Sequence, residues 1–324
     1  MKKTLALLTA LLLVLGIFAG CDNKPNDTAA NGKPAVVVTI FPEYDWVREI
    51  AGDTLGDIDL TLLLDSGVDL HSYQPTVEDI VKISNCDLFV YVGGESDKWV
   101  PDALAQSRNK EQKVLNLMDI LGENAKEEEV KEGMEAEEKE EEEEGPAYDE
   151  HVWLSLKNAA LFVGALRDAL CEVNAPDADA YRANADAYLA KLNALDGEYT
   201  AAVAAAKHKT LLFADRFPFR YLTDDYGLDY YAAFIGCSAE TEASFETIRF
   251  LATKVDELGL KSVLTIKGGN AKIAETVVAS TAGKNQTVLT LDSMQNTTAA
   301  DVEAGATYLA IMTDNLAVLR EALA

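Results

Sequence analysis

The run from residue 177 to residue 207 constrains the fold more than any other stretch of the chain. Alanine, leucine and tyrosine recur in it at helical spacing, no proline interrupts it, and its first glycine is Gly197. Pro176 stands directly before it, so we expect the helix to begin there. At a rise of 1.5 Å per residue, such a helix is about 45 Å long. It can therefore act as a stiff strut that joins two lobes.

Strand-like and helix-like runs alternate on both sides of this strut, which predicts parallel strands covered by helices. We expect strands at residues 35–41, 58–64, 88–92, 113–117, 210–213, 230–234, 262–266 and 287–291. We expect helices at residues 44–51, 75–84, 99–107, 154–173, 220–226, 245–258 and 271–281, and a last helix from Ala304. The predicted class is α/β, with two lobes, each a mainly parallel sheet flanked by helices, joined by one long rigid helix. We place the lobes at 35–175 and 208–324 and the linker helix at 176–207.

The negative charge of the chain limits its partners. Its 324 residues carry a formal charge of -27, which excludes non-specific binding of nucleic acid because phosphate would be repelled. Much of this charge lies in one acidic run, residues 126–146, which has almost nothing to bury. We predict a mobile, solvated loop there. The alternative is a loop that gathers cations and passes them to His151 nearby.

The first 20 residues have the features of an export signal. Two lysines precede an apolar run that ends in Ala19-Gly20-Cys21 and is short for a membrane span. This ending resembles a bacterial lipobox, in which the cysteine is lipidated. We therefore expect a signal peptide at 1–20, lipidation at Cys21 and a flexible tether at 21–34. A transmembrane anchor is the alternative, but the position of Cys21 favours an exported lipoprotein on the outer side of the cytoplasmic membrane.

Two of the three histidines stand where an element is expected to begin. His71 lies in the loop from Gly67 to Pro75, and His151 lies in Asp149-Glu150-His151-Val152-Trp153, just after the acidic run. Neutral imidazole is a common ligand of zinc and related ions, so the two rings could converge on one ion. The alternative is that each caps its helix. His208 is expected on the surface. The cysteines form no CxxC pair, so a structural zinc site built from cysteines is not expected.

A set of motifs, in order, covers the chain from about residue 36 to its end. They are Thr39-Ile40-Phe41-Pro42, Gly67 to Pro75, Asp87 to Gly94, Asp149 to Ser155, Tyr226-Gly227-Leu228, Leu291-Asp292-Ser293-Met294 and Tyr308 to Leu323. In these motifs the sequence resembles the zinc/manganese solute-binding lipoproteins of bacterial metal ABC importers. The resemblance implies two lobes joined by one long helix and four metal ligands, two from each lobe. It assigns His71 and His151 to the N-terminal lobe and Asp292 to the C-terminal lobe, and it implies an ABC permease in the cytoplasmic membrane as the partner of a monomeric receptor.

Two positions depart from the pattern of that family. The fourth ligand is normally a His or Glu after the strand that opens the C-terminal lobe, but this chain has Ala214-Asp215-Arg216 there. Asp215 is the nearest oxygen donor, and we treat it as a hypothetical substitute ligand. Lys267 stands where relatives often carry an acid, and could pair with Glu242 or Asp292 or occupy the site in the absence of metal. A mixed set of imidazole and carboxylate ligands suits zinc, with manganese or another divalent metal as the alternative.

Other functions are less favoured by the sequence. The segment 216–221 could line a basic, aromatic cleft for an organic or chelated ligand, although core packing with ion pairs to Asp224 and Asp225 is the preferred interpretation. The chain shows neither a His-Glu zinc-hydrolase helix nor a nucleophile-elbow motif, so we do not expect an enzyme. A surface adhesion protein is compatible with the tether and the acidic run but is not indicated by them.

Overall fold

Two parallel sheets, one in each lobe, form the framework of the protein. The computed structural model describes residues 32–135, 147–238 and 242–324. One sheet has the order β2-β1-β3-β4, with β1 (Ala35–Val38), β2 (Asp59–Leu62), β3 (Leu88–Tyr91) and β4 (Lys113–Asn116). The other has the order β6-β5-β7-β8, with β5 (Thr210–Phe217), β6 (Asp229–Ile235), β7 (Ser262–Ile266) and β8 (Thr287–Leu291). These strands all pair in parallel, so the carboxyl ends of each sheet share one edge, where ligands bind in open α/β sheets. The predicted two-lobed α/β class is confirmed.

Helices flank each sheet, and their bounds follow local capping signals. The N-terminal lobe carries α2 (Phe41–Ala51), α3 (Val77–Asn85), α4 (Val100–Ala105), α5 (Leu117–Leu121) and α6 (Leu156–Val173). The second half of the chain carries α8 (Arg220–Tyr226), α9 (Phe245–Leu258), α10 (Ala271–Ser280), α11 (Ala299–Glu303) and α12 (Tyr308–Ala322). Thr76 and Asp79 form a capping box at the start of α3. The last helix, expected from Ala304, is present as α12 but begins at Tyr308, because Gly305 has a φ of +98° and separates it from α11.

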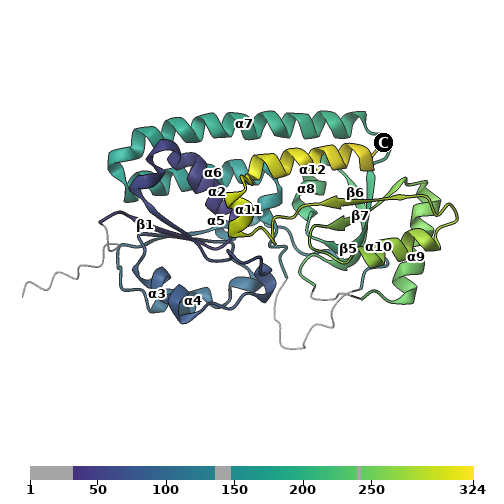
Figure 1. Ribbon diagram of the computed structural model, residues 1–324, viewed down its shortest axis with the longest axis horizontal. Coiled ribbons are helices and arrows are strands. Elements are labelled where there is room, and N and C mark those ends of the chain that lie inside the picture. Colours follow the sequence, from purple (N-terminus) through teal and green to yellow (C-terminus); the bar gives the residue numbers. More distant parts are fainter. Residues whose placement is uncertain (1–31, 136–146, 239–241) are drawn as a thin grey trace, which may run out of the picture.

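The long helix α7 (Ala178–Ala205) spans both lobes (Figure 1). It has 28 residues and packs against α2 and α6 on one side of the molecule and against α8 and α12 further along. The helix α12 runs beneath it, and the Tyr199 hydroxyl of α7 donates a 2.7 Å hydrogen bond to the carbonyl of Met312. The backbone N–H of Tyr308, at the start of α12, donates to Asp45 of α2. The expected long linker helix is therefore α7, and the shorter helix α12 also contacts elements of both lobes.

The first ten residues of the acidic segment, 126–135, lie against the C-terminal lobe. The backbone N–H of Lys126 donates to the Tyr221 hydroxyl at 2.9 Å, and the backbone N–H of Glu135 donates to the carbonyl of Ala233 in β6 at 2.9 Å. The acidic composition did not predict these contacts.

Several expectations fall outside the described residues. They are the signal peptide, the lipidation site Cys21, most of the tether and residues 136–146 of the acidic loop. Within the residues that the structure describes, none of the helices combines the length and apolar character needed to cross a membrane.

Candidate metal site between the lobes

His71 is presented by the loop that follows β2. Gly67 turns this loop with a φ of +76°, and a short 3-10 turn, Leu70–Ser72, follows. The Asp69 carboxylate caps the turn by accepting the backbone N–H of His71 at 3.1 Å. On the ring of His71, Nδ1 lies 2.8 Å from the Ser96 hydroxyl and 3.5 Å from the Glu150 carboxylate. These partners of Nδ1 orient the ring so that its Nε2 faces His151.

His151 is fully buried, directly before the 3-10 turn Val152–Leu154. One oxygen of Asp149 accepts both the backbone N–H of His151, at 2.8 Å, and its Nδ1, at 3.0 Å. A carboxylate can only accept, so neutral His151 keeps its ring proton on Nδ1 and its Nε2 has a free lone pair. The Tyr221 hydroxyl of the C-terminal lobe donates to the Asp149 carbonyl at 3.0 Å and anchors this segment across the boundary.

The two Nε2 atoms, one from His71 and one from His151, lie 3.2 Å apart. In a tetrahedral zinc site with zinc–nitrogen distances of about 2.05 Å, two ligand nitrogens are about 3.3 Å apart. The observed spacing therefore fits two ligands of one small tetrahedral ion. Burial opposes ionisation of the neighbouring Glu150, but its contacts with His71 and Ser96 hold the pKa of that carboxyl below its ordinary value. The buried Glu150 carboxylate is therefore negatively charged and lies on the Nδ1 side of the His71 ring. This charge favours a cation on the Nε2 side of the ring.

A third potential ligand, Cys237, joins the histidine pair. The Sγ atom of Cys237 and one ring nitrogen from each histidine all lie within 4.8 Å of one another. Cys237 lies two residues after β6, and the preceding Gly236 packs so closely that an added Cβ would lie 2.9 Å from the Phe217 carbonyl oxygen and 3.0 Å from the His151 ring. Burial raises the pKa of the Cys237 thiol well above its ordinary value, and the nearby carboxylate of Glu128 adds to this effect.

Cys237 was not expected as a ligand from the sequence, because the chain has no CxxC pair. A positional signal was available, since Cys237 stands three residues after the end of an expected strand of a parallel sheet. The carboxyl ends of such strands meet at the ligand-binding edge.

Asp215 lies within β5 and turns its carboxylate into the C-terminal lobe. It is 6% exposed and accepts the backbone N–H groups of Ile266, at 3.1 Å, and Arg216, at 2.9 Å. Burial raises the pKa of Asp215. The neighbouring Arg216 crosses to the N-terminal lobe instead, where its guanidinium pairs with Asp69 at 2.9 Å. That Asp69 carboxylate lies 4.0 Å from the Nε2 of His71, so Arg216 reaches the surroundings of the histidine pair and Asp215 does not belong to the converging group.

Asp292 follows β8 and is engaged by its own lobe. One carboxylate oxygen lies 2.9 Å from the Lys267 ammonium, and the other accepts the backbone N–H of Met294 at 2.7 Å. The hydrogen bond that Lys267 donates to the Asp292 carboxylate raises the pKa of Lys267. Pairing of Lys267 with Asp292, one of the two partners expected from the sequence, is confirmed. Asp292 likewise does not belong to the described group of converging ligand atoms.

The aromatic segment after β5 is part of the core. Phe217, Phe219 and Tyr221 are each at most 3% exposed, and Arg220 pairs with Asp224 and Glu129. The preferred interpretation of core packing with an ion pair to Asp224 is therefore confirmed. Asp225 pairs instead with Lys157.

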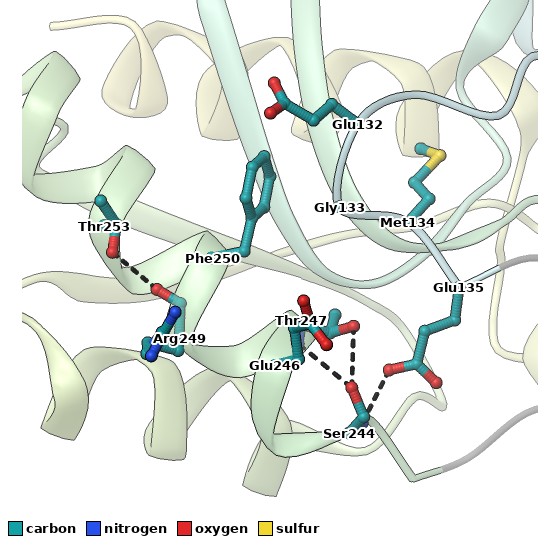
Figure 2. Close-up of a pocket in the computed structure, with 10 residues that line it drawn as sticks. All are labelled: Glu132, Gly133, Met134, Glu135, Ser244, Glu246, Thr247, Arg249, Phe250 and Thr253. Carbon is teal, nitrogen blue, oxygen red and sulfur yellow. Dashed lines mark hydrogen bonds between the residues drawn. The ribbon is translucent and has the colours of Figure 1, made fainter.

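A cavity of about 590 Å³ lies elsewhere, between the acidic segment and α9 (Figure 2). The Phe250 ring of α9 covers Gly133, and the Glu135 carboxylate accepts the backbone N–H of Ser244 at 2.7 Å. Its ten lining residues include no histidine or cysteine. The cavity shows how the acidic segment contacts α9, but it lacks the nitrogen and sulfur ligands of the histidine site.

Two parallel-sheet lobes bridged by a long helix, with a histidine pair at their boundary, define a class of two-lobed α/β binding proteins with a helical linker. The family comparison agrees with this class. The chain matches the sequence model of the ZnuA family, described as zinc-uptake complex component A, periplasmic, over residues 36–322. The chain belongs to the ZnuA family.

Individual relatives are similar over most of the chain. The zinc-binding protein AdcA of Streptococcus pyogenes serotype M3 is 31% identical over 326 residues, which cover 99% of this chain and 61% of that protein. The chain thus spans less than two thirds of that relative. The high-affinity zinc uptake system protein ZnuA of Bacillus subtilis is 28% identical over 313 residues, which cover 95% of this chain and 94% of the relative.

Solved structures match the whole described fold. The Zn(II)-bound ZnuA-like domain of Streptococcus pneumoniae AdcA matches with a TM-score of 0.70 at 28% identity, covering 90% of this chain and 99% of that domain. The metal-dependent lipoprotein YcdH of Bacillus subtilis matches with a TM-score of 0.72 at 27% identity, over the same shares of the two chains.

Proposed function

We propose that this chain is an extracytoplasmic receptor that binds a divalent metal ion, zinc above all, and delivers it to the permease of an ABC transporter. The observation that carries the proposal is the 3.2 Å separation of the Nε2 atoms of His71 and His151, which fits one tetrahedral ion. The names of the relatives, which refer to zinc binding and zinc uptake, support zinc over manganese. The receptor releases its ion unchanged and is not an enzyme.

We propose His71 and His151 as the ligands from the N-terminal lobe and Asp292 as a carboxylate ligand from the C-terminal lobe. Asp292 would bind the ion after leaving Lys267, its present partner. Asp215 is the alternative carboxylate, but it would have to give up two backbone N–H groups, which would remain buried without an acceptor. This cost favours Asp292.

The place of action follows from the proposed export signal. Lipidation of Cys21 would anchor the receptor to the outer face of the cytoplasmic membrane, close to the permease, and residues 22–34 would serve as the tether. A lipoprotein relative in Streptococcus pneumoniae, the zinc-binding lipoprotein AdcA, is 31% identical over 320 residues. We propose that the receptor acts as a monomer.

Calorimetric titration of the form that begins after Cys21 tests the metal assignment. The variants His71→Ala and His151→Ala each remove one coordinate bond, so each is expected to lower zinc affinity at least tenfold. His208→Ala is the matched control, because His208 is the third histidine of the chain and lies outside the converging group. Wild-type affinity in both site variants would refute the assignment.

The carboxylate ligand is tested in the same assay. Asp292→Ala is expected to weaken zinc binding, and Asp215→Ala is expected to lower stability more than affinity, because its carboxylate is buried against backbone donors. The reverse result would make Asp215 the ligand.

A further inference from the structure

We propose that Cys237 supplies a third metal ligand, and that its thiolate makes the site select zinc and other thiophilic ions over manganese. The proposal rests on the proposed metal-binding function and adds to it a ligand from the C-terminal lobe. The imidazoles come from one lobe and the thiolate from the other. An ion bound by all three would therefore hold the two lobes together.

The distances allow one ion to reach all three side chains. The ligand atoms of His71, His151 and Cys237 lie within 4.8 Å of one another. Around tetrahedral zinc, with zinc–nitrogen distances of about 2.05 Å and a zinc–sulfur distance of about 2.3 Å, nitrogen and sulfur ligands are about 3.6 Å apart. A movement of about 1 Å by the Cys237 side chain is therefore enough to complete the contact.

The turn that carries Cys237 is held in place on both sides. The backbone N–H of Cys237 donates to Glu128 of the acidic segment at 3.3 Å. The Arg216 guanidinium donates to the carbonyl of Ser238 at 3.3 Å and pairs with Asp69 of the other lobe. Gly236 lies against the His151 ring, where a larger residue would meet that ring. These contacts place the thiol beside the histidines.

The Cys237 sulfur is not in a disulfide, and its thiol donates a hydrogen bond to the Glu128 carboxylate that it would give up on binding a metal. Among the described residues, Cys86, Cys171 and Cys237 are all free cysteines, so no disulfide occupies the Cys237 sulfur. On binding, the thiol proton passes to solvent and the sulfur donates a lone pair to the ion, so no oxidant or reductant is needed.

The chemistry of the donors sets the preference among metals. Two imidazoles and a thiolate suit zinc, cadmium and monovalent copper, whereas manganese prefers carboxylate, carbonyl and water oxygens. Replacing the sulfur by a hydroxyl should therefore weaken zinc binding much more than manganese binding.

Cobalt(II) is the probe for the thiolate, because a thiolate bound to cobalt produces a charge-transfer absorption band in the near ultraviolet that imidazole and carboxylate ligands do not. The form beginning after Cys21 would be titrated with cobalt(II) as wild type, Cys237→Ser and Cys171→Ser. Cys171 is the matched control, since it is a free cysteine outside the converging group. We expect the band in wild type and in Cys171→Ser and its loss in Cys237→Ser. In calorimetry, Cys237→Ser should lower the ratio of zinc to manganese affinity at least tenfold.

The outcomes separate this inference from the function on which it rests. If wild type binds one equivalent of zinc through His71 and His151 but shows no thiolate band with cobalt, the thiolate ligand is refuted and the receptor function stands. A band that persists in Cys237→Ser also refutes it. If neither the wild type nor any variant binds zinc, manganese or cobalt(II), the proposed receptor function is refuted, and the thiolate ligand is refuted with it. Circular dichroism of Cys237→Ser checks that the variant is folded.

Discussion

The free energy of unfolding should fall as pH rises because Glu43 ionises, and replacing Glu43 by glutamine should abolish this fall. Glu43 is fully buried at the start of α2, where one carboxylate oxygen accepts the backbone N–H groups of Thr39, at 2.8 Å, and Ile40, at 3.2 Å. Its other oxygen has no hydrogen-bond partner among the described residues. Burial raises the pKa of Glu43 from 4.5 to about 8, because the backbone hydrogen bonds only partly offset the lost hydration.

The sign of the effect follows from this raised pKa. The folded protein holds the Glu43 proton more tightly than the unfolded chain does, so the contribution to stability is fully present below a pH of about 4.5 and is lost as pH rises through about 8. Each pH unit in this window costs about 1.4 kcal/mol, which amounts to a loss on the order of 5 kcal/mol at full ionisation. Glutamine carries no charge and can keep its oxygen on the same backbone donors.

Urea unfolding at pH 5 and pH 8, with a chelator present to remove bound metal, measures this effect. Between the two conditions, wild type should lose several kcal/mol more free energy of unfolding than Glu43→Gln. Asp97, with its pKa raised by burial to about 7, contributes to the pH dependence of both proteins. Its charge also raises the pKa of Glu43, so the difference between the two proteins contains the ionisation of Glu43 together with this coupling. Glu78→Gln, at an exposed position on α3, is the control. If the free energy of unfolding changes equally with pH in wild type and in Glu43→Gln, the ionisation of Glu43 does not destabilise the fold and the reasoning is refuted.

Three further predictions concern zinc affinity, each measured by calorimetric titration. Gly236→Ala should weaken binding about tenfold, because the added methyl group would displace the ring of His151, 3.0 Å away. Asp149→Ala should weaken it 10- to 100-fold, because it removes the carboxylate that holds the His151 Nδ1 proton. Lys267→Ala should strengthen binding severalfold if Asp292 is a ligand, because the variant frees that carboxylate from its 2.9 Å ion pair.

The controls for these variants come from the chain itself. Gly164→Ala introduces the same methyl group on α6, where an added Cβ meets no atom within 4 Å, and should leave affinity unchanged. Wild-type affinity in Gly236→Ala would contradict the close packing at the His151 ring. Weaker binding in Lys267→Ala would mean that the lysine supports the site and that Asp292 is not held back by it.

The periodicity of the sequence was sufficient to predict the fold class and many elements. The helix 245–258 and the strands 262–266 and 287–291 were predicted at their observed bounds. These elements depend on signals within a few residues of one another, such as a short apolar run in each strand and the Ser244 cap of α9. The family resemblance was likewise visible in local motifs, and the histidines it selected are the two whose rings meet. The last helix begins four residues later than expected, at Tyr308, because Gly305 has a positive φ.

Only the tertiary structure decided what surrounds the histidine pair. Arg216 reaches Asp69 across 147 positions in the chain, and Cys237 meets His151 because strand β6 pairs with β5 at the edge of its sheet. Nothing near Cys237 in the sequence points to His151. The partners of a side chain at a boundary between lobes depend on strand order and on how the lobes are placed, which arise from packing of the whole chain. Local propensity acts over a few residues and carries no information about that placement.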